Sequence, residues 1–233
     1  VAISNFRFGN GTNTYSSVQQ FFREGARPVN QSQINNYSIF NSFSIANTLI
    51  YRHKFKKKGR NFAASLGLNI NSSEGDNDQQ SVNTFGRVGR DSIVTINQFN
   101  DNQSARNQFK GSALFIEPIN KKFYWETFFN FSRRNEEVER NMFDRKPDFD
   151  QRNDQLSAYY TNAITYQRLG TSVRYSHKGL NISTGLAGVN YQLLGDFANS
   201  RQATEFTKVN RTFSVIVPNV SMNFDLKNNK YLY

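Results

Sequence analysis

Two classes of feature are missing from this sequence of 233 residues, and each absence excludes a class of structure. Cysteine is absent, which excludes disulfide bonds and metal sites built on thiolates. Hydrophobic residues make up only 37% of the chain, and no apolar run approaches the ~18 residues that a transmembrane helix needs. The sequence therefore predicts neither a disulfide scaffold nor a helical membrane protein.

Aromatic residues, in contrast, are abundant at 15%, with 22 phenylalanines and 11 tyrosines. The mean hydropathy is −0.68, which is hydrophilic on average. A transmembrane β-strand needs only ~9–11 residues with every second one apolar. A β-barrel can therefore span a membrane at this composition.

The formal net charge is +11, which indicates an anionic partner such as a nucleic acid or an anionic membrane surface. The chain contains no basic helix and no aromatic strand motif typical of RNA-binding domains. We therefore expect no nucleic-acid partner and interpret these basic residues as anchors at a membrane edge. They crowd at short turns: Lys54, Lys56, Lys57, Lys58, Arg60, Lys121, Lys122, Lys178, Lys227 and Lys230.

Residues 41–72 carry the clearest pattern in the chain. After the basic turn at residues 56–60, large apolar and small or polar side chains alternate with a period of two, as in a strand with one apolar face. The segment before the turn alternates in the same way, so the two predict a hairpin. A soluble β-sandwich and a transmembrane barrel both produce this alternation.

The spacing of the short turns favours the barrel over the sandwich. Turns are predicted at residues 56–60, 117–121, 177–179 and 227–230, about 50–60 residues apart, whereas a sandwich places turns every ~8–12 residues. Long polar loops are expected between them, at residues 9–36, 74–104, 144–154 and 195–208. The fold class predicted is all-β: an antiparallel up-and-down transmembrane barrel with short periplasmic turns and long extracellular loops. About eight strands of a larger barrel are expected here.

The alternation assigns a side to each residue. Residues 123–131 form the most aromatic strand, and Trp125 lies close to a turn, where an interfacial aromatic girdle is expected. The residues expected to face lipid are Phe62, Leu66, Leu68, Trp125, Phe129 and Phe131. The residues expected to face the lumen are Arg52, Asn69, Lys110, Glu126, Asn130 and Arg174.

Several short motifs occur in an order that resembles a known family. They are YRHKFKKKGR at residues 51–60, DSI at 91–93 with NQ at 97–98, EPINKK at 117–122, YQRLGTSVRY at 166–175 and VPNVS at 217–221. Together they resemble the outer-membrane β-barrel family of Bacteroidetes TonB-dependent receptors, over nearly the whole chain from about residue 37 onward.

The resemblance implies a 22-stranded barrel in the Gram-negative outer membrane, a plug domain in the same parent chain, and uptake of a solute energised by the TonB system. This chain contains too few strands and no plug or TonB-contact segment. It begins inside an expected strand and shows no signal peptide, so we expect residues 1–233 to be part of a single barrel domain of a longer polypeptide. The resemblance leaves the solute unassigned.

No residues are predicted to be catalytic, to ligate a metal or to bind a cofactor. His53 and His177 flank separate turns and lack a third ligand, so they are interpreted as interfacial polar residues. Acidic loop residues could in principle bind calcium, but they lack a calcium-loop pattern with a central glycine and are interpreted as solvated charges. These residues are Asp76, Asp78, Asp144, Asp148, Asp150 and Asp154.

Two rival functions accompany the prediction of a transporter barrel that is not an enzyme. The first is a structural or secretion-associated outer-membrane barrel without uptake. The second is a soluble all-β binding or adhesion domain. The soluble domain predicts that Phe62, Leu66, Leu68, Phe129 and Phe131 are buried against a second sheet, whereas the barrel predicts that they are exposed on an outward belt.

Overall fold

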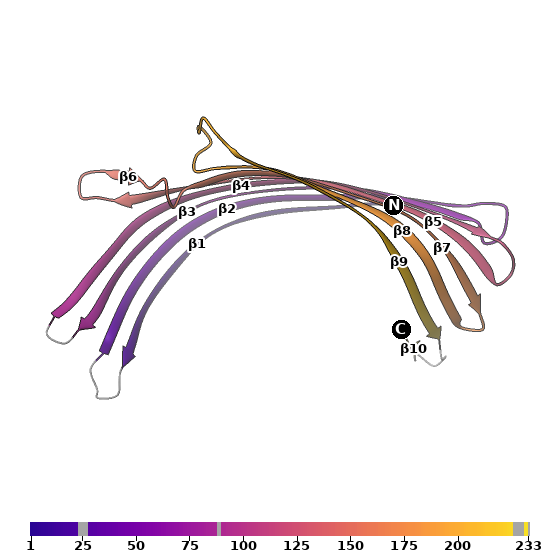
Figure 1. The fold of residues 1–233 in the computed structure, drawn as a ribbon, viewed down its shortest axis with the longest axis horizontal. Coiled ribbons are helices and arrows are strands. Elements are labelled where there is room, and N and C mark those ends of the chain that lie inside the picture. Colours follow the sequence, from indigo (N-terminus) through magenta and orange to yellow (C-terminus); the bar gives the residue numbers. More distant parts are fainter. Residues whose placement is uncertain (23–27, 88–89, 226–230, 233) are drawn as a thin grey trace.

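The computed structural model describes residues 1–22, 28–87, 90–225 and 231–232, and nearly all of them lie in one antiparallel β-sheet (Figure 1). The strands are β1 (Ala2–Phe22), β2 (Pro28–Lys54), β3 (Asn61–Arg87), β4 (Arg90–Pro118), β5 (Phe123–Arg145), β6 (Asp150–Arg152), β7 (Ala158–His177), β8 (Leu180–Ala198), β9 (Thr207–Asp225) and β10 (Tyr231–Leu232).

Each long strand pairs with its neighbours in sequence, in the order β1-β2-β3-β4-β5-β7-β8-β9-β10, while β6 pairs only with the end of β5. The sheet is curved and open, with β1 at one edge and β9 with β10 at the other (Figure 1). This is an antiparallel up-and-down arrangement, so the all-β fold class is confirmed. Within the described residues, no helix has the length and apolar character needed to cross a membrane.

One end of the sheet is closed by short turns, as expected. The β2–β3 turn spans residues 55–60, with Gly59 at a φ of 92°, a left-handed conformation that glycine adopts without strain. Lys178 and Gly179 alone join β7 to β8, and both have positive φ, as in two-residue hairpin turns. At residues 119–122, the Asn120 Oδ1 accepts hydrogen bonds from the backbone N–H groups of Lys122 and Phe123. The turn expected at residues 227–230 lies outside the described residues.

The expectation of long polar loops at the opposite end was wrong for most of the chain. Residues 9–22 and 28–36 belong to β1 and β2, and all described residues of 74–104 belong to β3 and β4. These strands are 21, 27, 27 and 29 residues long. Polar side chains typical of loops lie on paired strands here, because the backbone ladder satisfies their N–H and C=O groups.

Cross-strand hydrogen bonds between side chains also link these extensions. Ser73 Oγ lies 2.9 Å from Ser104 Oγ, and Ser16 Oγ donates to Asn35 Oδ1 at 2.7 Å. The other two expected loops exist but are shorter or partly ordered as strand. The β8–β9 loop spans residues 199–206, and the connection after β5 contains β6.

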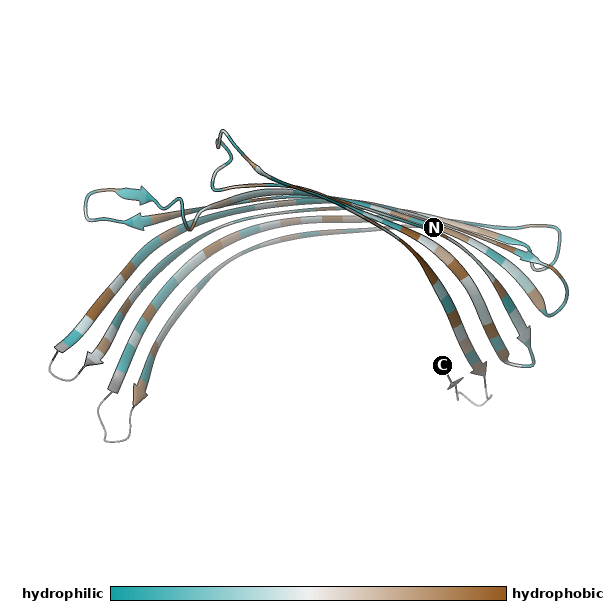
Figure 2. Ribbon diagram, viewed as in Figure 1, coloured by the Kyte–Doolittle hydropathy of each residue, from teal (hydrophilic) through white to brown (hydrophobic). Residues whose placement is uncertain are grey.

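The strands give the sheet two faces, which we call face A, the side that carries Asn69, and face B, the side that carries Leu68. Hydrophobic and hydrophilic residues alternate along the strands (Figure 2). On β7 and β8, face A residues such as Gly170, Ser172 and Ala187 are buried, while Leu169 and Leu186 on face B are exposed. Crowding on one face is expected on the inner side of a curved sheet, so we infer that face A is the inner side.

The second sheet that the rival soluble domain requires is not found within the described residues. Within the described residues the fold has a single layer, and no second sheet covers the large apolar side chains. Leu66 is 50% exposed, and Leu68 and Phe129 are each 41% exposed. The apolar side chains of face B therefore form an open surface.

Candidate functional site

The residues expected to face a lumen all lie on face A. Arg52 pairs with Ala63, Asn69 with Gln108, and Lys110 with Gly67, which places all three on the same side of β2, β3 and β4. The ladder continues across the sheet with the same sidedness. Its further pairs are Ser112 with Asn130, Glu126 with Ser172, and Tyr124 with Arg174.

The residues expected to face lipid lie together on face B. Phe62 opposes Phe115, Leu68 opposes Phe109, and Phe129 opposes Leu169. Leu66 and Phe131 both oppose Gly111, and Trp125 opposes Glu117 on the same side. The register thus groups both sets as the alternation predicted, while contact with lipid or with a lumen stays a prediction.

An apolar band crosses face B next to the short turns. It continues over β7, β8 and β9, where the exposed fractions reach 60% for Leu169, 56% for Leu186 and 75% for Val220. Each strand contributes about four alternate positions to the band. Its main residues are Ile45, Leu49, Tyr51, Phe62, Leu66, Leu68, Phe109, Phe115, Trp125, Phe129, Phe131, Leu169, Val173, Leu180, Ile182, Leu186, Ile216, Val220 and Met222.

Behind this band, face A carries a charged cluster on β5 and β7. The Arg174 Nε lies 3.1 Å from the Glu126 Oε1, and the Ser172 hydroxyl donates to the Glu126 Oε2 at 3.4 Å. The Arg174 guanidinium also lies over the Tyr124 ring, 5.0 Å from its centroid. Two of the six residues expected to face a lumen are therefore joined directly.

Charge is segregated between the two faces. This holds for the charged residues on the eight long strands, counting only residues whose side chains the structure describes. Face A carries ten basic and three acidic residues: Arg7, Arg52, Lys54, Arg106, Lys110, Arg134, Arg140, Arg168, Arg174 and Arg211 against Glu126, Glu136 and Asp144. Face B carries three basic and nine acidic residues: Arg133, Arg145 and Lys208 against Glu74, Asp76, Asp78, Asp91, Asp101, Glu117, Glu137, Glu139 and Asp196.

The few carboxylates of face A already have partners. Glu126 pairs with Arg174 as described, and Glu136 accepts from the Arg106 Nη2 at 2.6 Å. Asp144 accepts hydrogen bonds at 2.9 Å from Gln98 and from Asn153, and these bonds hold the pKa of its carboxyl below the usual value. Most basic side chains of face A are therefore left without a carboxylate among the described residues.

At the short-turn end, the structure joins two of the motifs that resemble the receptor family. The Glu117 carboxylate accepts from Arg60 at 2.5 and 2.8 Å and from the Lys57 Nζ at 2.6 Å. Hydrogen bonds from Arg60 and Lys57 lower the pKa of Glu117 to about 2. The β2–β3 turn is thereby tied to the end of β4, beyond the edge of the apolar band.

At the opposite end, the β8–β9 loop is tied to face B. The Tyr159 hydroxyl donates to Glu137 Oε1 at 3.0 Å, and the Arg201 Nη2 lies 3.1 Å from the same oxygen. The ring of Phe206 packs against Tyr159 with centroids 6.0 Å apart. Tyr159 is only 9% exposed, and this burial together with the neighbouring Glu137 raises the pKa of its hydroxyl. The loop is thus anchored to the buried Tyr159 and to the carboxylate of Glu137.

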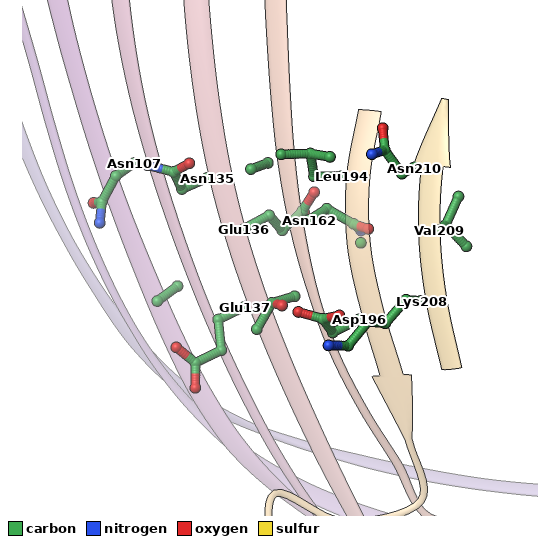
Figure 3. Close-up of a pocket in the computed structure, with 14 residues that line it drawn as sticks. Asn107, Asn135, Glu136, Glu137, Asn162, Leu194, Asp196, Lys208, Val209 and Asn210 are labelled. Atoms are coloured by element: carbon green, nitrogen blue, oxygen red, sulfur yellow. The ribbon is translucent and has the colours of Figure 1, made fainter. Parts of the chain in front are cut away.

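A shallow depression of about 550 Å³ lies on face B between the apolar band and this loop (Figure 3). Side chains from β4, β5, β7, β8 and β9 line it, including Asn107, Asn135, Glu137, Asp196 and Lys208 (Figure 3). The depression could not be predicted from the sequence, because its lining residues come from five strands whose registers the sequence does not give. Its lining mixes apolar side chains such as Leu194 and Val209 with polar ones and carries both signs of charge.

No metal centre is found in the described part of the chain, where no three His, Asp or Glu side chains come together as ligands would. Of the acidic residues considered for calcium, Asp78 pairs with Arg145 at 2.5 Å, and Asp154 pairs with Arg152. His53 packs edge-on against Phe55, and His177 lies near Tyr175 on a different hairpin.

No family model matches the sequence, and no curated protein matches it. Among solved structures, the sheet is similar to the ferric citrate transporter FecA in its unliganded form, with 8% identity and a TM-score of 0.41, over 95% of this chain and 37% of that one. It is also similar to the ferric yersiniabactin uptake receptor FyuA from Yersinia pestis, with 8% identity and a TM-score of 0.39, over 97% and 44% of the two chains.

A third similar structure is BauA, the ferric preacinetobactin receptor from Acinetobacter baumannii, with 8% identity and a TM-score of 0.40, over 97% of this chain and 45% of that one. The chain thus spans less than half the length of these three proteins.

Proposed function

We propose that this chain forms part of the wall of a β-barrel in a Gram-negative outer membrane, within a TonB-dependent receptor that takes up a solute. All of residues 1–233 then belong to one barrel domain, and the plug domain lies elsewhere in the parent chain. Face B borders the outer-membrane lipid, and face A borders the lumen. The role is in binding and transport, without catalysis.

The observation that carries the proposal is the exposed apolar band of face B on a sheet only one layer thick. Large exposed apolar surfaces are unfavourable in water and mark contacts with a membrane or a partner. On each strand the band covers about four alternate positions, or roughly 20 Å along the strand at ~3.3 Å per residue, which is of the same order as the ~25 Å apolar belt of an outer-membrane barrel. Aromatic Tyr51 and Trp125 lie at its edge beside the short turns, where interfacial aromatic girdles occur.

The polar character of face A supports the assignment of the lumen. Ionisable side chains at mid-bilayer depth cost roughly 2–4 kcal/mol when they face lipid, so a membrane wall turns them inward. Lys110, Glu126 and Arg174 lie behind the band on face A. The ordered sequence motifs at the hairpin turns resemble those of TonB-dependent receptors. This resemblance is the reason for preferring solute uptake to a purely structural barrel.

The test compares Leu66→Arg and Leu68→Arg with the matched control Asn69→Arg in the full-length protein that contains this chain. The two leucines lie on face B, and Asn69 is the immediate neighbour of Leu68 on face A. Arginine on the lipid face should reduce heat-resistant, folded protein in the outer-membrane fraction, whereas Asn69→Arg should assemble normally. Normal assembly of both leucine variants would contradict the membrane assignment.

Uptake is tested separately from assembly. Wild-type protein in the outer membrane should cross-link to TonB through a photoreactive probe, and growth on the transported solute should require a functional TonB system. A barrel that assembles normally but neither cross-links nor supports TonB-dependent growth would indicate the structural or secretion-associated alternative.

A further inference from the structure

We propose that face A binds an anionic solute through a cluster of basic side chains on β4, β5 and β7. The cluster, which we call the basic cluster, consists of Lys110, Arg134 and Arg168, with the neutral donors Asn130 and Ser132 among them. This inference rests on the proposed function, because it names the chemical class of the solute that the lumen receives.

The register brings these residues together across three adjacent strands. Lys110 on β4 opposes Ser132 on β5, and Asn130, two positions along β5, opposes Arg168 on β7. Arg134 follows Ser132 at the next position on the same face. Directly opposed and diagonal neighbours in a sheet lie ~5–8 Å apart at their Cβ atoms, so one carboxylate- or phosphate-bearing molecule can reach several of these donors.

The donors have unused capacity. Among the described residues, no hydrogen bond or ion pair engages the side chains of Lys110, Arg134 or Arg168, and the buried Nε atoms of the two arginines also have no partner. Arg168 lies over the Phe128 ring, 5.0 Å from its centroid, which holds the guanidinium against the wall. A planar guanidinium with free N–H groups is suited to carboxylates and phosphates.

The charge pattern of the whole sheet supports an anion over a cation or a neutral solute. The carboxylates of face A are engaged by Arg174, Arg106, Gln98 and Asn153, so they leave the basic cluster unneutralised. Face B, which is acidic, lies on the other side of the same layer. A lumen lined in this way concentrates anions and repels cations.

The experiment measures equilibrium binding to the full-length protein, purified in detergent, with citrate and inorganic pyrophosphate as anionic probes and sucrose as a neutral one. Variants Arg134→Gln and Arg168→Gln are compared with the matched control Arg133→Gln, which removes an adjacent arginine from face B. Each face A variant should weaken binding of an anionic probe roughly tenfold, because a hydrogen bond to a charged group is lost. The face B control should stay within about twofold, and raised salt should weaken binding further.

Several results would overturn the inference. Wild-type protein that binds neither anion, or that binds sucrose equally well, would exclude an anion site. An equal loss in Arg133→Gln would indicate a general charge effect. If the face A variants instead loosen the assembled receptor and leave anion binding unchanged, the basic cluster holds an acidic segment of the parent protein.

Failure of the anion site can be distinguished from failure of the barrel proposal. Wild-type protein that assembles in the outer membrane and still binds no anion removes only the anion site. Wild-type protein that never enters the membrane fraction removes the barrel proposal itself.

Discussion

Asp76 on β3 and Asp101 on β4 lie directly opposite each other in the ladder, with both carboxylates on face B and far from the apolar band. Like charges in this position destabilise a strand pair. Burial is the larger cause that raises the pKa of Asp101, and the charge of Asp76 raises it further.

The first prediction follows from this pair. The pKa of Asp101 is higher in the folded than in the unfolded protein. Ionisation of Asp101 therefore lowers the free energy of unfolding once the pH rises above the usual pKa of an aspartate. Asp76→Asn should therefore stabilise the sheet at pH 7 by about 0.2–1 kcal/mol. The gain should vanish at low pH, where the Asp101 carboxyl is protonated and no longer repels a charge on Asp76. Urea unfolding of the barrel in detergent at the two pH values checks this; an equal gain at both would exclude the electrostatic cause.

The second prediction concerns the Glu117 carboxylate at the β2–β3 turn. Its pKa is lowered to about 2 from an ordinary value of 4.5. The stabilisation by Lys57 and Arg60 is therefore fully present above about pH 4.5 and is lost as the pH falls toward 2. The urea midpoint of wild-type protein should approach that of Glu117→Gln over this interval. A carboxyl NMR titration with an ordinary midpoint would contradict the prediction.

The third prediction concerns close packing on face A. A Cβ added at Gly185 would clash with the Thr171 carbonyl oxygen and lie 2.6 Å from the Ser172 Cβ, whereas one at Gly188 would meet only the Leu169 carbonyl oxygen at 3.9 Å. Gly185→Ala should destabilise the fold by about 1–3 kcal/mol, because backbone must shift. Gly188→Ala should change stability by less than about 0.5 kcal/mol. Equal effects in unfolding experiments would show that crowding on face A is relieved cheaply.

The fourth prediction concerns the ion pair between Glu126 and Arg174. Their side chains are 16% and 34% exposed, so Glu126→Gln should cost about 1–2 kcal/mol, between the values for surface and buried pairs. The charge-exchanged double variant Glu126→Arg with Arg174→Glu should recover part of the loss. A double-mutant cycle with no coupling energy would contradict direct pairing.

The sidedness of the sheet could be predicted from sequence, because the side-chain period of two assigns a face before any partner strand is known. For this reason the alternation correctly placed Phe62 and Leu66 on one face of the sheet and Asn69 on the other. The short turns were also found, since Gly59 and Gly179 with their basic flanks are strong local signals.

The length of the strands could not be predicted in the same way. Asn, Ser and Gln between residues 74 and 104 are typical of loops, and only pairing with a neighbouring strand shows that their backbone is extended. The basic cluster was missed because only the register of β4, β5 and β7 places Lys110, Arg134 and Arg168 around Asn130 and Ser132 on one face. The charge segregation has a local signal on β3, where Glu74, Asp76 and Asp78 fall on alternate positions and so share one face.

The great length of the strands has a consequence for how a solute is captured. The 29 residues of β4 span roughly 95 Å at ~3.3 Å per residue, several times the ~25 Å height of an outer-membrane apolar belt. Most of β2, β3 and β4 would then stand outside the apolar belt as a continuous hydrogen-bonded collar. A solute would meet a stiff, pre-shaped funnel, and its binding would require little loss of chain entropy compared with closure of mobile loops. Solutes would then bind and leave the outer end of the strands quickly, and discrimination between solutes would occur deeper in the barrel.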